Sequence, residues 1–247
     1  MFHGDILQAW IRKHNTHIPM NHMYNSSAIN FFPTSKLFAG VLALTFLAAF
    51  PVRAANWYVN DGSQTGDVYT SAVGAVGGTG TASDPFLTIS QAISASASSD
   101  IIYVDAGTYS ENITVAKSIE LRGPNYNVSP NTGTRVAEAI LVPASTNTST
   151  GAVVTITSGG FSFNGFTVDG DNASLPSSGV GLGGALGTSI DAARTIFVNA
   201  NGINGVTIAN NIAKNAVNGI RLEQTTNYFA TSAGAVRSTN INVNDNK

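Results

Sequence analysis

Phe163-Asn-Gly-Phe-Thr-Val168 and Ile203-Asn-Gly-Val-Thr-Ile208 are two copies of one short unit, forty residues apart. Apolar residues alternate in each copy with small or polar ones, which is the period of a strand with one buried face. At the same offset Thr155-Ile156 matches Thr195-Ile196, and Thr239-Asn-Ile-Asn-Val243 is a weaker third copy. A repeat at a fixed offset predicts a solenoid, in which each coil of chain stacks on the one before.

Short apolar runs of the same kind continue along the chain, separated by Gly, Asn, Ser and Pro, which favour turns. The predicted strands are residues 57–59, 101–104, 113–115, 119–121, 140–142, 153–156, 161–163, 166–168, 196–198, 206–208, 220–222 and 241–243. Ile196 and Ile220 are twenty-four residues apart, and Ile220 and Ile241 are twenty-one apart. These intervals predict a period near 22, with three strands per coil and forty residues as two coils. A β-sandwich is the alternative, but it leaves the repeated Asn-Gly-x-Thr unit unexplained.

Stacked coils bring strands about 4.8 Å apart and bury their alternate apolar side chains in one interior. Asparagines at equivalent turns then form hydrogen-bonded ladders between coils. The candidates are Asn164 with Asn204, and Asn210 and Asn211. The fold class predicted is therefore all-β, a right-handed parallel β-helix.

One segment has a helical pattern instead. Residues 85–97 place Leu87, Ile89, Ala92 and Ile93 on one side of a helix. Ser83 or Asp84 is the expected N-cap, and Pro85 suits the first helical position. Because an open stack of strands leaves unpaired backbone groups at its end, we expect this short N-terminal helix to cap the stack.

The first fifty-four residues indicate export. Residues 37–50 are continuously apolar, which is too short for a membrane span of about 20 residues. Val52 and Ala54 give the small residues of a signal-peptide cleavage site, so we predict cleavage after Ala54, with a retained anchor as the alternative. The leader before residue 37 is long, and a start at Met20 or Met23 would shorten it.

Composition excludes several kinds of site. The 247 residues contain no cysteine, and all four histidines lie in the first twenty-two. A mature chain therefore has no disulfide, histidine general base or zinc–histidine site. After Ala54, eight Lys and Arg residues stand against thirteen Asp and Glu residues, a net charge of −5. Without a basic run, nucleic acid is not expected as a partner.

Residues 84–123 carry a pattern of Asp84-Pro-Phe-Leu-Thr-Ile-Ser-Gln-Ala-Ile93, then Asp100-Ile-Ile-Tyr-Val-Asp-Ala-Gly-Thr-Tyr-Ser-Glu-Asn-Ile-Thr-Val115, then Ile119-Glu-Leu-Arg-Gly123. This pattern resembles the opening of the pectin-lyase-like superfamily of right-handed parallel β-helix repeat proteins. The resemblance implies an N-terminal capping helix, a stacked β-helix and an extracellular role in carbohydrate contact or cleavage. Pectinesterases share this opening, but their two-aspartate motifs have no counterpart after Phe166, where the chain reads Asn210-Asn-Ile-Ala-Lys-Asn-Ala-Val-Asn-Gly-Ile220. A pectate-lyase calcium cluster is not visible either.

No catalytic residue is therefore predicted, and whether the chain is an enzyme stays open. Asp169 and Asp171 offer oxygen ligands that suit calcium, although Asp-Gly-Asp-Asn is also an ordinary turn. Asp105 and Glu111 flank a predicted turn at Gly107-Thr-Tyr109 and are expected to cap backbone amides of that turn. Arg221 and Glu223 are expected to form a surface pair.

Aromatic side chains that point outward would suit stacking against sugars. The candidates are Tyr103, Tyr109, Tyr126, Tyr228 and Phe229. Residues 172–192 interrupt the forty-residue repeat and predict a loop inserted between coils, where we expect a ligand groove.

The predicted organisation is a leader and signal peptide over 1–54, an N-terminal strand and Gly-rich loop over 55–83, and a parallel β-helix over 84–247. Because the sequence ends inside a repeat, at Lys247, we expect a fragment truncated at its C-terminus. The predicted function is a secreted or cell-surface protein that contacts extracellular carbohydrate. The alternatives are the N-terminal part of a polysaccharide-acting enzyme, of pectate lyase or pectinesterase type, and a structural stalk. No cofactor is predicted other than calcium, and no membrane span is expected in the mature chain.

Overall fold

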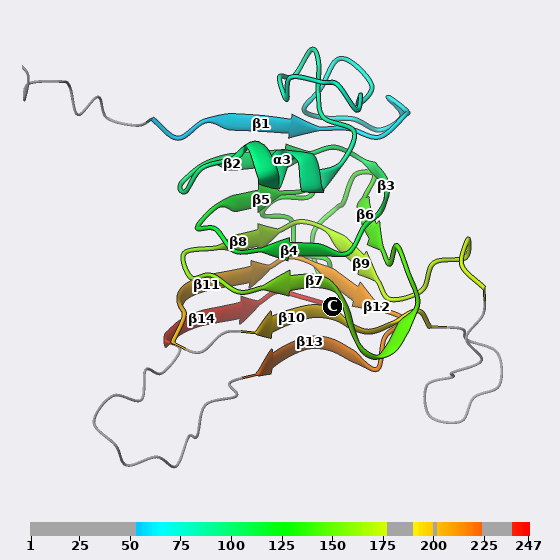
Figure 1. Cartoon of the computed structure of the whole chain (residues 1–247), viewed down its shortest axis with the longest axis vertical. Coiled ribbons are helices and arrows are strands. Elements are labelled where there is room, and N and C mark those ends of the chain that lie inside the picture. The colour runs from blue at the N-terminus through cyan, green and yellow to red at the C-terminus, as the bar shows by residue number, and fades with distance from the viewer. Residues whose placement is uncertain (1–52, 177–189, 200–201, 224–238) are drawn as a thin grey trace, which may run out of the picture. The chain divides into compact units, whose positions relative to one another are not determined.

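The computed structural model describes residues 53–176, 190–199, 202–223 and 239–247, which form three parallel sheets (Figure 1). Sheet 1 contains β1 (Asn56–Val59), β2 (Ile101–Val104), β5 (Glu120–Arg122), β8 (Ser162–Asn164), β11 (Asn204–Ala209) and β14 (Thr239–Asn244). Sheet 2 contains β3 (Gly107–Ser110), β6 (Ala139–Val142), β9 (Thr167–Asp169) and β12 (Ile212–Lys214). Sheet 3 contains β4 (Ile113–Val115), β7 (Asn147–Ile156), β10 (Ala192–Asn199) and β13 (Asn218–Glu223).

The chain visits the three sheets in turn. One coil is β2-β3-β4, the next is β5-β6-β7, and two more follow the same order. Every strand pair in the three sheets is parallel. This topology confirms the predicted right-handed parallel β-helix, the hand that parallel crossovers adopt. It rules out the β-sandwich, which needs antiparallel layers.

The interior is a column of apolar side chains, one from each rung of sheet 1. The strand register aligns Trp57, Ile102, Leu121, Phe163 and Ile208. Ile102, Leu121, Phe163 and Ile208 are fully buried. At Phe163 the column is reinforced by Phe166, whose ring stacks on it with centroids 4.3 Å apart. Alternation then directs the neighbouring residues of each strand outward.

The predicted period of 22 is wrong for most of the molecule. In sheet 1, Ser162 lies beside Thr207, an interval of 45 residues, and Glu120 lies beside Ser162, an interval of 42. Forty residues therefore fall short of one coil here and do not make two, and Phe163 pairs with Ile208 and not with Ile203. Long loops between sheets account for the difference, because they lengthen a coil without adding strands. Intervals near 22 do occur, since Ile196 and Ile220 are register partners 24 residues apart and Ile102 and Leu121 are register partners 19 residues apart.

Two strands were not predicted. Residues 107–109 were expected to form a turn, but they lie in β3 and pair with β6. Strand β12 lies in a stretch for which no strand was predicted. Both strands are short and contain few branched apolar residues, so their alternation is weak. All the predicted strands are present, with ends that differ by a few residues.

Helix α3 (Ile89–Ala95) begins later than predicted. Its N-cap is Thr88, which forms a capping box with Gln91, and not Ser83 or Asp84. The preceding residues are extended instead, because Phe86 donates its amide to the Tyr58 carbonyl and accepts the Asn60 amide on its own carbonyl. The helix buries Ile89, Ala92 and Ile93, as expected.

Residues on either side of β4 hold both ends of α3. At the N-terminus Glu111 accepts hydrogen bonds from the amides of Ile89 and Ser90, at 2.8 and 2.9 Å. At the C-terminus the Lys117 ammonium donates to the carbonyls of Ile93, Ser94 and Ser96. Both charges have the sign that the helix dipole favours. The helix thus covers the free edge of β4, and the predicted cap is confirmed (Figure 1).

Asparagine ladders connect the coils, in part as predicted. The Asn164 amide nitrogen donates to Asn127 Oδ1, and the Asn210 amide nitrogen donates to Asn164 Oδ1, both at 3.0 Å. A second ladder runs from Asn211 to Asn246 at 3.1 Å. The predicted pairing of Asn164 with Asn204 is wrong, because the coil is longer than forty residues and Asn210 occupies the equivalent turn.

The Asp100 carboxylate fixes the entry to the first coil. It accepts hydrogen bonds from the amides of Ala55 and Ala97 and from the Trp57 indole, at 2.7 to 2.8 Å. Burial opposes ionisation of this carboxyl group, but these donors and the Lys117 charge outweigh it, so the pKa of Asp100 is lowered.

We predict that Asp100→Asn lowers the free energy of unfolding by about 1–3 kcal/mol at pH 7, because an amide group cannot accept all three hydrogen bonds. A lowered pKa in the folded state stabilises the fold above the unfolded value, near 3.8, and that stability is lost as the pH falls through the folded value. The difference between the two proteins should therefore shrink in acid. Urea denaturation of both proteins at pH 7 and in acid measures this difference in the free energy of unfolding.

The matched control is Asp245→Asn, which replaces an exposed carboxylate near the last strand. It should change stability by less than about 0.5 kcal/mol. An Asp100→Asn protein as stable as the parent at pH 7 would contradict this role.

Candidate functional site

The outer face of sheet 1 begins with a pair of stacked tyrosines. Tyr58 and Tyr103 are register partners on β1 and β2, and their ring centroids are 5.3 Å apart. They point outward because Val59 and Val104, next to them, are fully buried in the core. Both tyrosines remain partly exposed, so their aromatic surface is accessible to a ligand.

A third tyrosine comes from the loop that follows β1. The Tyr69 ring lies 5.0 Å from that of Tyr103, at an angle of 58°. Its hydroxyl group donates to the Gly123 carbonyl at 2.7 Å. Burial, followed by the charge of Asp105, raises the pKa of Tyr69 to about 12. This hydroxyl therefore stays protonated at neutral pH and serves as a donor.

The loop that carries Tyr69 is held by buried polar groups. Asp105 is fully buried and accepts hydrogen bonds from the amides of Val68, Tyr69 and Thr70. Three amides converging on one carboxylate form a rigid anion nest. Asp105 therefore positions Tyr69 against Tyr103.

Asn60 holds the same loop from the end of β1. This fully buried side chain donates to Asp67 Oδ2 at 2.6 Å, to Thr70 Oγ1 at 3.0 Å and to the Ala72 carbonyl at 2.9 Å. Burial raises the pKa of Asp67, despite the hydrogen bond from Asn60. Sequence alone indicates none of these contacts.

Arg122 continues the tyrosine column on the next rung, where its Cα is the register partner of Tyr103. Its guanidinium carbon lies 4.3 Å from the ring centroid of Tyr126 and 5.6 Å from that of Tyr103. Its Nη2 pairs with Glu120 Oε2 at 2.6 Å. This hydrogen bond raises the pKa of Arg122. Cation–π contact and ion pair together hold the guanidinium in one position.

We name this surface the tyrosine face. It consists of Tyr58, Tyr69, Tyr103, Tyr126, Arg122 and Glu120. Its side chains are all partly exposed, and four of them are aromatic with a polar end. Such side chains combine an apolar surface with a hydroxyl group that hydrogen-bonds. Sugar rings have matching chemistry, because their C–H faces are apolar and their rims carry hydroxyls.

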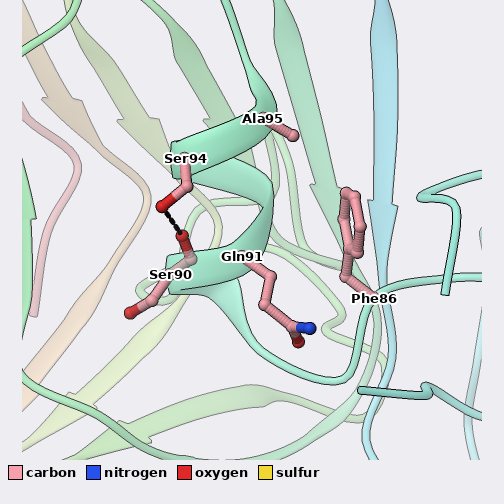
Figure 2. A pocket seen from close by; sticks show the side chains of 5 residues that line it. All are labelled: Phe86, Ser90, Gln91, Ser94 and Ala95. Atoms are coloured by element: carbon pink, nitrogen blue, oxygen red, sulfur yellow. Dashed lines mark hydrogen bonds between the residues drawn. The ribbon is translucent and has the colours of Figure 1, made fainter. Parts of the chain in front are cut away.

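Two hollows in the described part lie elsewhere. The first, of about 550 Å³, lies between Phe86 and the outer side of α3 (Figure 2). Its lining has no ionisable group. The Ser94 hydroxyl donates to the Ser90 carbonyl and the Ser90 hydroxyl to Glu111, so these polar groups are already used within the protein.

The second hollow, of about 310 Å³, is lined by residues that include Asp61 and Glu111. Glu111 holds the start of α3, and Asp61 Oδ1 accepts the Ser63 amide at 2.7 Å. Both carboxylates therefore bind backbone amides. Asp105 and Glu111 do cap backbone amides, but the predicted location at 107–109 is wrong, because Asp105 caps residues 68–70 and Glu111 caps the start of α3.

Asp169 and Asp171 are close together, and the Asp169 carboxylate already has partners. Asp169 Oδ2 pairs with Lys214 at 3.0 Å, and its Oδ1 accepts the Asp171 amide at 3.1 Å. Burial and the nearby Asp191 carboxylate raise the pKa of Asp171. No group of three or more acidic or histidine side chains is arranged for a metal in the ranges that the structure describes. Calcium binding by Asp169 and Asp171 stays a prediction.

The other candidates are placed as follows. Tyr103 and Tyr126 belong to the tyrosine face, but Tyr109 is a core residue with 3% of its surface exposed. Tyr228, Phe229, most of the loop over 172–192 and the leader up to residue 52 lie outside the described residues. Arg221 and Glu223 pair at 3.1 Å on β13, as expected.

Sequence reasoning missed Tyr58, Tyr69, Arg122 and Glu120 as site residues. The alternation of Glu120 and Arg122 around buried Leu121 was visible and placed both outward. They share a face with Tyr58 only because residues 45 apart in the sequence are register partners on β1 and β2. No local sequence pattern indicates this pairing.

Comparison with known proteins adds little. No protein-family model matches the chain, and no curated protein sequence matches it. Among solved structures, it is similar to a pectin methylesterase in complex with hexasaccharide VII, with 16% identity and a TM-score of 0.36 over 60% of this chain and 44% of that one. It is also similar to pectin methylesterase PemA from Erwinia chrysanthemi, with 16% identity and a TM-score of 0.37 over 65% and 43%. The chain thus matches less than half the length of either enzyme.

We predict that Asp105→Asn frees the loop around Tyr69, because an amide group cannot accept hydrogen bonds from three backbone amides. Hydrogen exchange at residues 68–70 should accelerate at least about tenfold, which corresponds to about 1.4 kcal/mol of lost protection. Mass spectrometry of peptides over 60–75 measures it.

The control is Asp84→Asn, which alters the carboxylate that accepts the Thr79 amide in the neighbouring turn. It should leave exchange at 68–70 unchanged. Unchanged exchange in Asp105→Asn would show that the loop is held by other contacts.

Proposed function

We propose that this chain binds carbohydrate through the tyrosine face. The observation that carries the proposal is a partly exposed cluster of four tyrosines, in which the rings of Tyr69 and Tyr58 lie 5.0 and 5.3 Å from that of Tyr103 and Tyr126 lies against Arg122. Soluble proteins bury most of their aromatic surface, so a partly exposed cluster on a rigid sheet indicates a binding role.

The rigidity of this surface supports the proposal. Tyr58 and Tyr103 stand on adjacent strands, Asp105 fixes Tyr69, and Arg122 lies against Tyr126. A ligand would therefore meet side chains that are already ordered, which reduces the entropy lost on binding.

We also propose that the protein is exported, as the apolar run over 37–50 and the small residues before position 55 indicate. In the part of the chain that the structure describes, no helix is long and apolar enough to cross a membrane. Extracellular polysaccharide is then the proposed ligand. The alternative, part of a polysaccharide-acting enzyme, stays a prediction, since the acidic groups at the described hollows bind backbone amides.

We predict that Tyr103→Ala weakens binding to soluble polysaccharide about tenfold or more. The substitution removes the ring that Tyr58 and Tyr69 contact and the stacking surface itself, and aromatic contacts of this kind contribute about 0.5–1.5 kcal/mol each. Affinity electrophoresis against a panel of neutral and acidic polysaccharides measures it, with the free energy of unfolding determined in parallel.

Tyr109→Phe is the matched control, because Tyr109 is buried and its hydroxyl bonds to the Asp105 carbonyl. Its binding should equal that of the parent. If the parent binds no polysaccharide in the panel, or if Tyr103→Ala binds as well as the parent, the proposed function is wrong.

A further inference from the structure

Charge on the tyrosine face points to the class of polysaccharide. We propose that the ligand is an uncharged polysaccharide and that Glu120 is the residue that excludes acidic ones. This inference rests on the proposed function, since it concerns the same surface. Arg122, the single cation of the tyrosine face, is paired with Glu120.

Arg122 is engaged at each accessible end of its guanidinium group. Nη2 donates to Glu120 Oε2 at 2.6 Å, and Nη1 donates to the Tyr103 hydroxyl at 3.3 Å. The flat side of the group lies over Tyr126, and Nε is buried. A sugar carboxylate binds arginine best through two parallel hydrogen bonds to neighbouring nitrogens. Here Glu120 already holds one of them.

The outward positions beyond Arg122 carry no charge. The column of Glu120 continues across the next two rungs of sheet 1 through Ser162 and Thr207, which are partly exposed. The column of Arg122 continues through Asn164 and Ala209, which are buried. Hydroxyl groups exchange hydrogen bonds with sugar hydroxyls but do not attract a carboxylate. The face therefore has one cation and one anion in contact, followed by neutral polar groups.

Three other cations of the described coils are similarly occupied. Arg135 pairs with Glu138 at 2.6 Å, and Lys214 pairs with Asp169 at 3.0 Å. Lys117 is bound to the end of α3. With a net charge of −5 after Ala54, the protein repels a polyanion at long range. An uncharged chain meets no such penalty.

The test compares polymers that share a backbone and differ in carboxylates. The pairs are hydroxyethyl cellulose with carboxymethyl cellulose, and fully methyl-esterified polygalacturonan with polygalacturonate. Affinity electrophoresis is run on the full chain and on Glu120→Gln, which keeps the size and a hydrogen-bond acceptor for Arg122 but removes the negative charge.

The parent should bind the uncharged member of a pair at least about tenfold more tightly than the acidic member. Glu120→Gln should tighten binding of the acidic member about tenfold and change the uncharged one less than about twofold, because the charge of Arg122 is then no longer neutralised by a carboxylate. Added salt should reverse this tightening of binding to the acidic member. The matched control is Glu223→Gln, which removes the same charge from the Arg221 pair on β13 and should not tighten acidic binding.

The outcomes separate the two proposals. If the parent binds the acidic member as tightly as the uncharged one, the inference is wrong and the proposed function stands. The inference is also wrong if Glu120→Gln leaves the preference unchanged, or if Glu223→Gln shifts it equally. If the parent binds neither member of any pair and nothing in the wider panel, the proposed function fails and this inference fails with it.

Discussion

The parallel register between successive coils is the constraint on which the rest of the structure depends. In the strands of sheet 1, one set of alternate residues faces the interior and includes Ile102, Leu121 and Phe163. The alternate residues of the same strands place Tyr58 beside Tyr103, and Tyr103 beside Arg122, on the outside. A shift by one residue would exchange the two faces. Burial of the apolar column thus fixes which strand residues of the tyrosine face point outward, namely Tyr58, Tyr103, Glu120 and Arg122.

Carboxylates attach the irregular segments to this regular stack. Asp100 holds the start of β1, Asp105 holds the loop of Tyr69, and Glu111 holds α3. Each of them accepts hydrogen bonds from two or more main-chain amides, which stabilises the charge away from bulk water. These acidic residues therefore have structural partners, and the proposed binding depends on tyrosines and one arginine.

Much of the fold was predictable, because alternation of apolar residues is local. Ile113-Thr-Val115 and Val206-Thr-Ile208 show it plainly, and both are strands. Coil length was not predictable, since loops such as 123–138 lengthen a coil without leaving a periodic signal. The same limit applies to the site. Tyr103 and Tyr126 could be proposed from their residue type, whereas Tyr58 reaches Tyr103 only through a pairing 45 residues apart. The predicted early start of α3 was wrong for another reason. Residues near Pro85 form backbone hydrogen bonds with β1 and with the loop that follows it.

The most direct test of the register is short-range cross-linking of paired cysteines, which is simple because the chain has none of its own. Ser162 and Thr207 are outward partners on β8 and β11, and Asn242 is the next residue of their column. Adjacent strands lie about 4.8 Å apart and alternate ones about twice that. A bifunctional thiol-reactive reagent that spans about 5 Å should link Ser162→Cys to Thr207→Cys and leave Ser162→Cys with Asn242→Cys unlinked. Failure of the first pair, or equal linking of both, would contradict the stacking described here.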